Sequence, residues 1–310
     1  MDGVTLNVRR GKTLGLVGES GCGKSVTAHS IMKLLPKAGR IPKGEILIRL
    51  KNGEEFDILK LSNKSRRLRE LRGRDIAMIF QSPMSSLNPV YRIGDQIVEM
   101  IQSHEKVSKK DAMARAVEML GKLGIPQAEE RVKDYPHQFS GGMKQRVMIA
   151  MGMVCNPEIL IADEPTTALD VTIQAQILGL MTQVQKDYGV TIIMITHNMG
   201  IVAEMADDIA VMYMGKVVEC GTKEDIFLHP SHPYTRALLK SVPVLGIGGD
   251  ERLLPIRGNT PDPSDMPVGC AFRDRCDFAC EKCMQQPSAT HLEGDHYVSC
   301  WNIQGGDINA

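Results

Sequence analysis

A glycine-rich stretch near the N-terminus constrains the fold more than any other feature of the chain. Residues 18–25 read Gly-Glu-Ser-Gly-Cys-Gly-Lys-Ser and fit the pattern G-x-x-x-x-G-K-[ST]. The apolar run Leu14–Val17 precedes them, and a helix-compatible segment, Val26–Leu35, follows. Glycines let consecutive backbone N–H groups turn toward one anion, and a helix start adds a positive dipole end. The stretch therefore predicts a phosphate-binding loop between a strand and a helix.

The loop also predicts which side chains meet a nucleoside triphosphate. Lys24 is expected to reach the β- and γ-phosphates, and Ser25 to coordinate Mg²⁺. The competing interpretation is a glycine-rich turn in an α/β protein, which the strand–loop–helix context disfavours. The residues expected to contact the nucleotide are Gly18, Glu19, Ser20, Gly21, Cys22, Gly23, Lys24, Ser25 and Val26.

Two adjacent acids, Asp163 and Glu164, end the apolar run Ile159–Ala162. Such a run predicts a buried strand that delivers acid to the edge of a sheet. With a phosphate loop upstream, Asp163 is expected to hold the magnesium ion through water and Glu164 to polarise the attacking water. The alternative for this pair is a solvated turn before Pro165.

The bulk composition is that of an ordinary soluble protein and excludes several classes. The chain has 310 residues, room for about two domains, and 37 basic side chains balance 37 acidic ones. Because of this balance, the chain has no net positive charge that would attract nucleic acid or an anionic membrane surface. No apolar run approaches the ~20 residues that span a bilayer, and residues 1–4 lack a signal-peptide layout. We expect an intracellular protein whose membrane association comes through a partner.

Short apolar runs alternate with helical segments, which predicts an α/β fold with a mixed, mainly parallel sheet. Strand-like runs disappear between about Asn88 and Cys155, so that stretch is expected to be an inserted helical subdomain. After Ser231 prolines break the chain repeatedly, which predicts a small loop-rich extension. The predicted division is ATPase core at 1–87, helical subdomain at 88–155, core again at 156–230 and extension at 231–310. The predicted strands are Leu14–Val17, Ile46–Ile48, Ile76–Phe80, Ile159–Ile161, Ile192–Ile195 and Ile209–Tyr213.

A second glycine motif makes the pattern specific to one family. Residues 139–146, Phe-Ser-Gly-Gly-Met-Lys-Gln-Arg, resemble the signature motif of ATP-binding-cassette (ABC) ATPases. In register with that family, Gln81 resembles the glutamine loop, 159–164 the Walker B strand, 168–170 the D-loop and His197 the switch histidine. The resemblance covers residues 3 to 230 and implies a P-loop NTPase that hydrolyses ATP with Mg²⁺.

The resemblance assigns roles beyond the phosphate loop. It implies that Glu164, His197 and Gln81 serve catalysis, and that Gln81 joins Ser25 and Asp163 at the magnesium ion. It also implies that the signature contacts ATP held by an opposing ATPase subunit in a head-to-tail dimer. A free helix start with small side chains is by itself a second anion site. The residues assigned to that second face are Ser140, Gly141 and Gly142, and Asp170 of the D-loop is also expected to bind the nucleotide.

Two segments narrow the resemblance. Residues 81–89 and 229–239 resemble oligopeptide, dipeptide and nickel importers. This implies an ATPase at the cytoplasmic face of a bacterial or archaeal membrane, working with integral membrane permease subunits and a non-identical ATPase paralogue. An extracytoplasmic solute-binding protein would act indirectly, and no nucleic acid is expected. The alternatives are a non-transport ABC ATPase acting on nucleic acid or translation, and a catalytically weak regulatory subunit; intact Glu164 and His197 argue against the latter.

One departure from the family lies at the N-terminus. Family members stack adenine on an upstream aromatic side chain, whereas no residue before Gly18 is aromatic and Phe56 is the first. The match begins abruptly at Asp2–Leu6, which resembles the middle of the family's opening sheet. We expect the N-terminal strand pair to be absent, through an internal start codon or truncation. Lost base stacking would cost about 1–3 kcal/mol of nucleotide affinity.

Five of the eight cysteines crowd the last 41 residues. Four of them resemble the C-terminal motif of peptide-importer ATPases that carry a four-iron, four-sulfur (4Fe-4S) cluster, for which thiolates are the ligands. Cys280 is an extra candidate, structural zinc also accepts four cysteines, and uncoordinated thiols are the third possibility. Disulfides are disfavoured in a reducing cytosol. Cys22, Cys155 and Cys220 are expected to be small buried side chains. The four candidate cluster ligands are Cys270, Cys276, Cys283 and Cys300.

Overall fold

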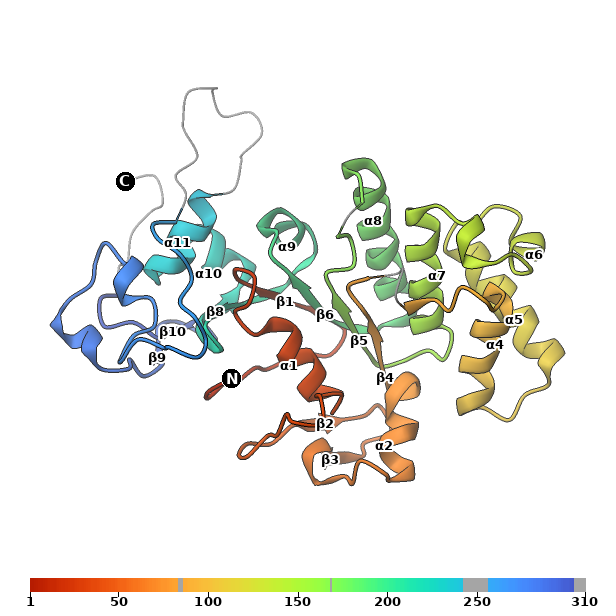
Figure 1. Cartoon of the computed structure of the whole chain (residues 1–310), viewed down its shortest axis with the longest axis horizontal. Coiled ribbons are helices and arrows are strands. Elements are labelled where there is room, and N and C mark those ends of the chain that lie inside the picture. Colours follow the sequence, from red (N-terminus) through yellow and green to blue (C-terminus); the bar gives the residue numbers. More distant parts are fainter. Residues whose placement is uncertain (83–85, 168, 242–255, 304–310) are drawn as a thin grey trace. The chain divides into compact units, whose positions relative to one another are not determined.

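The computed structural model describes residues 1–82, 86–167, 169–241 and 256–303 (Figure 1). The chain divides into two compact units. Unit 1 comprises Met1–Thr27 and Met194–Ala310, and unit 2 comprises Ala28–Ile193. Parts of three predicted features lie outside the described residues: Pro83–Ser85 of the importer-like segment, Ala168 of the D-loop, and Pro243 and Pro255 of the extension. The four-part division predicted above stays a prediction.

Unit 1 contains a mixed sheet. The strand β1 pairs with β7 in parallel, in a register that sets Leu14 opposite Asp208, and the pairs β7–β8, β8–β10 and β10–β9 are antiparallel. All five residues of β1 are buried, as expected for a strand that is covered on both faces. Across this part of the sheet the strands are β1 (Thr13–Val17), β7 (Asp208–Tyr213), β8 (Lys216–Thr222), β10 (Tyr297–Val298) and β9 (Thr290–His291).

The helices of unit 1 begin at well-defined caps. Asn198 caps α9 (Met199–Met205), and Thr222 forms a capping box with Asp225 at α10 (Lys223–Leu228). His232 caps α11 (Pro233–Lys240), whose first residue is a proline with φ already suited to a helix. Two short 3-10 helices, η4 (Arg273–Arg275) and η5 (Glu281–Met284), follow in the C-terminal extension. Because β10 pairs with β8, the extension is attached to the sheet of unit 1.

Unit 2 holds the strands that carry the acid pair. β4 (Ile76–Ile79) and β5 (Ile159–Asp163) pair in parallel, with Ile76 opposite Ile159. A separate antiparallel pair joins β2 (Leu47–Arg49) to β3 (Glu55–Asp57), followed by η1 (Ile58–Lys60), α2 (Arg66–Glu70) and η2 (Leu71–Asp75). Two elements cross the boundary between the units along the chain: α1 (Lys24–Ile31) and β6 (Thr191–Thr196).

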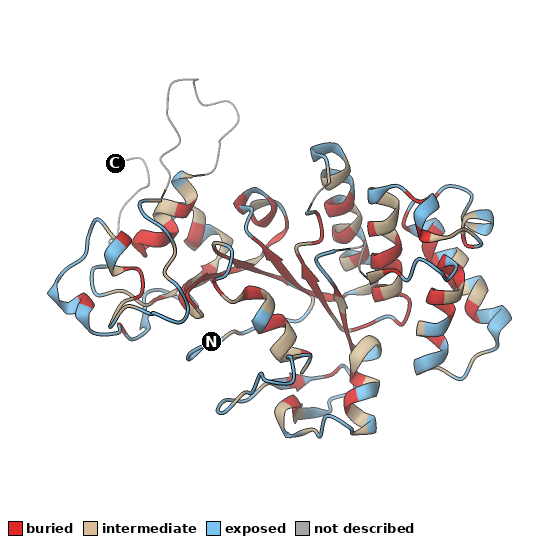
Figure 2. Ribbon diagram, viewed as in Figure 1, coloured by how far each residue is buried: buried red, intermediate tan, exposed pale blue. Residues whose placement is uncertain are grey.

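The rest of unit 2 is helical (Figure 1). Over residues 88–155, all of which are described, the structure has helices and no strand, which confirms the helical insertion in the predicted fold. Figure 2 shows buried residues along the inward faces of these helices and exposed ones outside, the pattern of amphipathic helices packed on one another. The helices are α4 (Ile93–His104), α5 (Lys109–Lys122), α6 (Ala128–Arg131), η3 (Pro136–Gln138), α7 (Gly141–Met153) and, after β5, α8 (Val171–Tyr188).

The six predicted strands are all present, with ends shifted by a residue or two. Prediction from apolar runs missed β3, β8, β9 and β10, which are short or carry polar side chains. None of the helices in the described ranges is both long and apolar enough to cross a bilayer.

Candidate functional site

The phosphate loop of unit 1 depends on its glycines. Gly18, Gly21 and Gly23 have φ values of 150°, 81° and 106°, a region that side chains rarely allow. A Cβ atom on Gly18 would also collide with the carbonyl oxygen of Met212 and lie 2.8 Å from the Sγ of Cys22. The loop therefore lies tightly against β7, which explains why glycine occupies position 18.

Lys24 is folded back over the loop. Its Nζ donates to the carbonyl oxygens of Gly18 at 2.7 Å and Glu19 at 3.0 Å, and the side chain is buried. When a nucleotide binds, its phosphate oxygens can replace these carbonyl oxygens as the acceptors of the Lys24 ammonium group. The neighbouring thiol of Cys22 is fully buried, and burial raises its pKa although Lys24 opposes that effect. Cys22 therefore serves packing.

Sequence reasoning missed two partners of this loop. The backbone N–H of Glu19 donates to the hydroxyl of Tyr234 at 2.9 Å, and the Glu19 carboxylate accepts two hydrogen bonds from Arg275. These residues lie 215 and 256 positions away along the chain. No local pattern could have shown the contacts.

The acid pair of unit 2 lies at the end of β5. Asp163 ends β5 and is 3 % exposed, whereas Glu164 has a φ of 46°. One carboxylate oxygen of Glu164, Oε2, accepts hydrogen bonds from Gln81 Nε2 at 2.8 Å and from Thr167 Oγ1 at 2.9 Å. A non-glycine residue in this backbone region is held there by its surroundings, a feature concentrated at functional sites. Gln81 and Glu164 thus lie together, and Thr167 is a third member that the sequence did not reveal.

The signature forms the start of α7, also in unit 2. Ser140 is the N-cap, and its Oγ accepts a hydrogen bond from the N–H of Met143 at 3.3 Å. The first turn holds no acidic side chain, so the helix start keeps its affinity for an anion. A Cβ on Gly142 would lie 2.7 Å from Ile173, and one on Gly141 3.6 Å from Leu169. The glycines therefore let α7 approach the start of α8.

Two other predicted residues lie in different settings. Asp170 is the N-cap of α8, where its Oδ1 accepts from the N–H of Ile173 at 2.9 Å, so its carboxylate already has a structural task. His197, in unit 1, follows β6 directly and is exposed. The nucleotide roles of both stay predictions, as do those of the other site residues.

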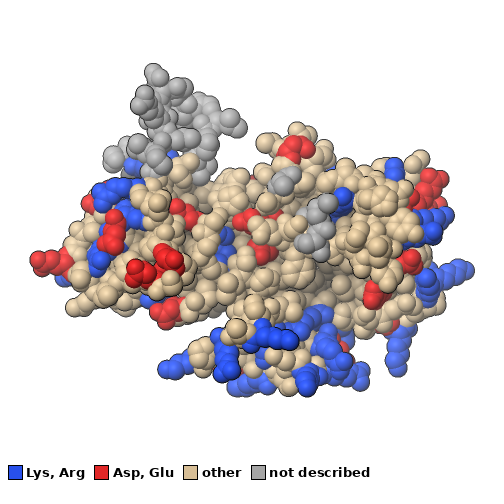
Figure 3. All heavy atoms as spheres, in the orientation of Figure 1, with Lys and Arg blue, Asp and Glu red and all other residues tan. Residues whose placement is uncertain are grey.

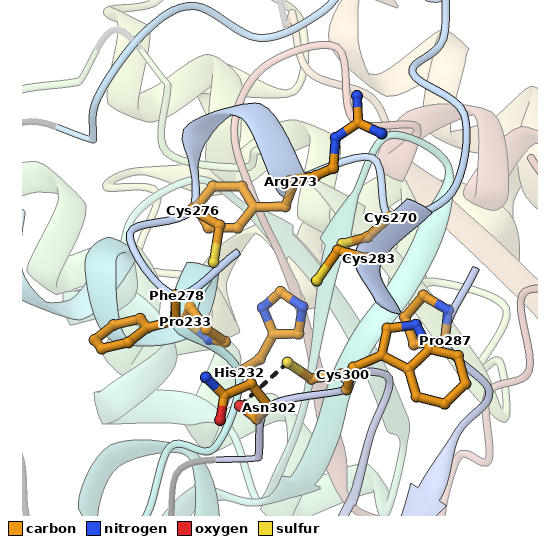
Figure 4. A pocket seen from close by; sticks show the side chains of 12 residues that line it. His232, Pro233, Cys270, Arg273, Cys276, Phe278, Cys283, Pro287, Cys300 and Asn302 are labelled. Carbon is orange, nitrogen blue, oxygen red and sulfur yellow. Dashed lines mark hydrogen bonds between the residues drawn. The ribbon is translucent and has the colours of Figure 1, made fainter. Parts of the chain in front are cut away.

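The four candidate cluster cysteines line one pocket in the extension (Figure 4). His232 lines it too: its Nδ1 accepts from the N–H of Tyr234 at 3.0 Å, and its buried Nε2 has no hydrogen-bond partner in the described part of the chain. Cys280 is exposed, with its Sγ 3.7 Å from that of Cys283. The donor chemistry, thiols plus an unpartnered imidazole N–H, fits a thiolate-bound metal group.

The arrangement of these thiols nevertheless falls short of a formed metal site. Among the described residues, no three or more His, Cys, Asp or Glu side chains are grouped so that they could hold a metal ion. Burial raises the pKa of Cys270, Cys276 and Cys300, the last to about 11. The thiols are therefore protonated unless a cation enters the pocket.

Comparison with known proteins decides the family. A family model described as ABC transporter matches residues 1–167, and a model of the oligopeptide/dipeptide transporter C-terminal region matches residues 218–283. The chain belongs to the ABC transporter family. The predicted P-loop NTPase fold and ATPase activity of this family are thereby confirmed.

Individual ABC proteins match over most of the chain. The dipeptide transport ATP-binding protein DppD of Bacillus subtilis is 51 % identical over 96 % of this chain and 88 % of its own length. The oligopeptide transport ATP-binding protein OppD of the same organism is 50 % identical, over 96 % and 82 %. Among solved structures, a dimer of the ATP-binding cassette MJ0796 bound to ADP and Pi superposes with a TM-score of 0.61 at 26 % identity, covering 71 % of this chain and 89 % of that one.

Proposed function

We propose that this ABC ATPase hydrolyses ATP to power the import of peptides through partner membrane subunits. Support comes from relatives named as dipeptide and oligopeptide transport proteins, and from the peptide-transporter C-terminal region at residues 218–283. The observation that carries the catalytic part is Glu164, held by Gln81 and Thr167 at the end of β5. Nickel, the other solute suggested by the sequence, is the runner-up.

In the proposed mechanism the chain's residues bind and orient ATP and the attacking water. The phosphate loop surrounds the phosphates with N–H groups, and Lys24 turns from the carbonyl of Gly18 to the γ-phosphate. Ser25, Gln81 and Asp163 would hold Mg²⁺, which would supply charge neutralisation at the phosphates. Glu164 accepts a proton from water, and the two hydrogen bonds on its Oε2 hold the carboxylate in place for that step. His197 is proposed to sense the γ-phosphate.

The second face of each site is proposed to come from another ATPase, a non-identical paralogue arranged head to tail. The helix start at Ser140 is exposed and has no acidic side chain in its first turn, as a surface that receives a partner's phosphate requires. MJ0796, one of the similar structures, is a dimer bound to ADP and Pi. ATP would then bind the closed pair preferentially and shift the population toward it.

A surface for the membrane subunits is proposed beside the glutamine loop, at the cytoplasmic face of the membrane. Val90 and Tyr91 are 72 % and 57 % exposed there, just before α4. Large apolar side chains exposed next to one another mark interaction sites. The solute-binding protein would take part only through the permeases.

A role on nucleic acid is disfavoured by the charge pattern. Basic side chains gather over β2, β3 and α2 (Figure 3). Arg66 and Arg67 in this segment are paired with Glu70 and with Glu54 and Asp75. Nucleic-acid surfaces instead offer basic side chains to phosphates along a stripe.

The test is transport in proteoliposomes that contain the permeases and both ATPases, with solute-binding protein and ATP. Peptide uptake and vanadate-sensitive phosphate release are expected together, and both should be lost with Glu164→Gln. Uptake of nickel without peptide would select the runner-up. ATP hydrolysis without uptake of either solute would contradict the proposal.

We further propose that the pocket lined by Cys270, Cys276, Cys283 and Cys300 takes a 4Fe-4S cluster. Four thiols and the unpartnered Nε2–H of His232 on one pocket support this. Protein purified without oxygen should be brown from thiolate-bound iron, and it should lose iron on Cys276→Ser. Colourless protein with stoichiometric zinc would identify zinc instead. Colourless protein without metal would contradict both.

A further inference from the structure

The C-terminal extension reaches the phosphate loop within unit 1. Arg275, in η4, donates from Nη1 to Glu19 Oε2 at 2.6 Å and from Nη2 to Glu19 Oε1 at 3.0 Å. The arginine side chain is 5 % exposed and that of Glu19 25 %. A two-pronged arginine–carboxylate pair fixes both distance and orientation, and partial burial limits screening by salt.

Arg275 is itself held in place from several sides. Its Nε donates to the carbonyl oxygen of Arg257 at 2.9 Å, and Nη1 also reaches the hydroxyl of Tyr213 at 3.3 Å. The guanidinium lies 5.8 Å and 5.9 Å from the ring centres of Tyr213 and Phe272. Because all three of its nitrogens have partners, the side chain has little freedom, and the loop contact loses little entropy.

Tyr234 holds the same loop residue through its backbone. Its hydroxyl accepts the N–H of Glu19 at 2.9 Å, and its ring is fully buried, 4.7 Å from the ring centre of Tyr213 and 5.2 Å from that of Phe272. Burial raises the pKa of this hydroxyl, so it stays neutral. Glu19 is thus fixed both at its amide and at its carboxylate by residues that follow β8 in the chain.

We infer that Arg275 and Tyr234 are positioning residues for the nucleotide: they fix Glu19 and with it the path of the phosphate loop. A phosphate loop binds by aiming several N–H groups at one anion, so a small change in its path weakens several bonds together. Neither residue touches ATP in this account. Both lie beyond residues 1–167, which the ABC transporter family model matches. The inference rests on the ATP binding of the family, and it holds whatever occupies the cysteine pocket.

The test measures nucleotide affinity on the full-length chain without permeases, together with kcat at saturating ATP. Arg275→Ala should raise the Kd for ATP about tenfold or more, the change expected when a charge-assisted pair is lost, and leave kcat within about twofold. Arg275→Lys should restore part of the affinity, and Tyr234→Phe should weaken binding less than Arg275→Ala. Arg257→Ala is the matched control: its exposed side chain reaches Asp277 at 3.6 Å and the carbonyl oxygen of Asp274 at 3.4 Å but not Glu19, so the Kd should not change.

A double-mutant cycle separates this role from general packing. If Arg275 acts through Glu19, the change in Kd for Glu19→Gln with Arg275→Ala should equal that for Arg275→Ala alone. Additive changes, or a lower Tm with an unchanged Kd, would overturn the inference. Should Arg275→Ala fail to fold, Arg275→Lys with Glu19→Gln completes the same cycle. These Kd values do not depend on peptide import. The positioning role of Arg275 and the proposed import of peptides can therefore be disproved separately.

Discussion

The backbone of Glu164 is held in an unusual conformation by neighbouring side chains. Its φ of 46° costs about 1 kcal/mol for a residue with a side chain. The hydrogen bonds from Gln81 and Thr167 offset that cost and fix the carboxylate. Glu164 is therefore held at the strand end by two hydrogen bonds to its carboxylate oxygen Oε2.

Glu164→Gln should remove the proton acceptor and leave the loop intact. We expect the rate of phosphate release to fall by about 10²–10⁴-fold, the usual contribution of a general base, while the Kd for ATP changes little. A phosphate-release assay and fluorescent-nucleotide titration measure the two. Glu204→Gln, at an exposed position of α9, removes the same charge and should leave both unchanged. A variant with normal turnover would exclude Glu164 as the base.

The residues of the proposed nucleotide site differ in how far away their partners lie in the sequence. The sequence suggests Lys24, Asp163 and Ser140 because each belongs to a short motif whose chemistry is local. It does not suggest Arg275, since its partner Glu19 is 256 positions away and neither residue is unusual where it stands. Thr167 was missed for a related reason: its contact with Glu164 depends on a backbone turn that periodicity does not encode.

At the scale of elements, the strands were predicted where apolar runs are continuous, as in β1 and β6. The prediction missed β8 because Glu219 interrupts its apolar residues. That carboxylate is fully buried and accepts from the N–H groups of Ser231 and His232, with His296 at 2.9 Å. Buried acid with three partners is a tertiary arrangement, so the apolar pattern of the sequence alone does not indicate this strand.

The approach of α7 to α8 predicts opposite effects at two helical glycines. Gly142→Ala places a methyl group 2.7 Å from Ile173 Cγ2, so the signature start should shift and the ATPase rate should drop severalfold. Gly121→Ala in α5 meets open space and should raise the free energy of unfolding by about 0.5–1 kcal/mol through helix propensity. Denaturant melts and ATPase assays of both variants test this. Equal effects at the two positions would refute the packing argument.

Arg115 in α5 joins three helices of unit 2. It makes two hydrogen bonds to Glu105, directly after α4, and one to the carbonyl oxygen of Val154 at the end of α7. Both side chains are about a third exposed, so Arg115→Met should lower the free energy of unfolding by only about 1–2 kcal/mol. Lys122→Met removes an exposed pair with Glu118 in the same helix and an exposed hydrogen bond to Tyr188, and it should lower the free energy of unfolding less than Arg115→Met does.

The Arg115–Glu105 pair should make the stability of the protein depend on pH in a definite direction. The hydrogen bonds of Arg115 hold the pKa of Glu105 below its ordinary value of 4.5. A carboxyl with a lowered folded pKa stabilises the protein above its unfolded pKa and loses that contribution as pH falls through the folded pKa. The stability difference between wild type and Arg115→Met should therefore be constant above pH 5 or so and shrink below it. A difference that grows on acidification would contradict this account.

At the scale of the whole molecule, the predicted nucleotide contacts form two sets, the phosphate loop and the signature. The two sets at one nucleotide can come from two different chains. The phosphate loop is in unit 1, and the signature helix start is in unit 2. If two ATPases pair head to tail, each site combines the phosphate loop of one chain with the signature of the other. Two variants of this chain then damage different sites of the same pair.

Nucleotide trapping distinguishes shared from self-contained sites. In this experiment the chain is paired with the wild-type second ATPase and trapped with Mg²⁺ and vanadate. The Lys24→Ala variant should retain one of the two nucleotides, because only its own phosphate loop is lost. Ser140→Arg should also leave one, now at the other site, since a bulky cation replaces the cap of the helix start. The combined variant should retain none. If each chain held a complete site, the combined variant would still retain the partner's nucleotide, and the head-to-tail arrangement would be wrong.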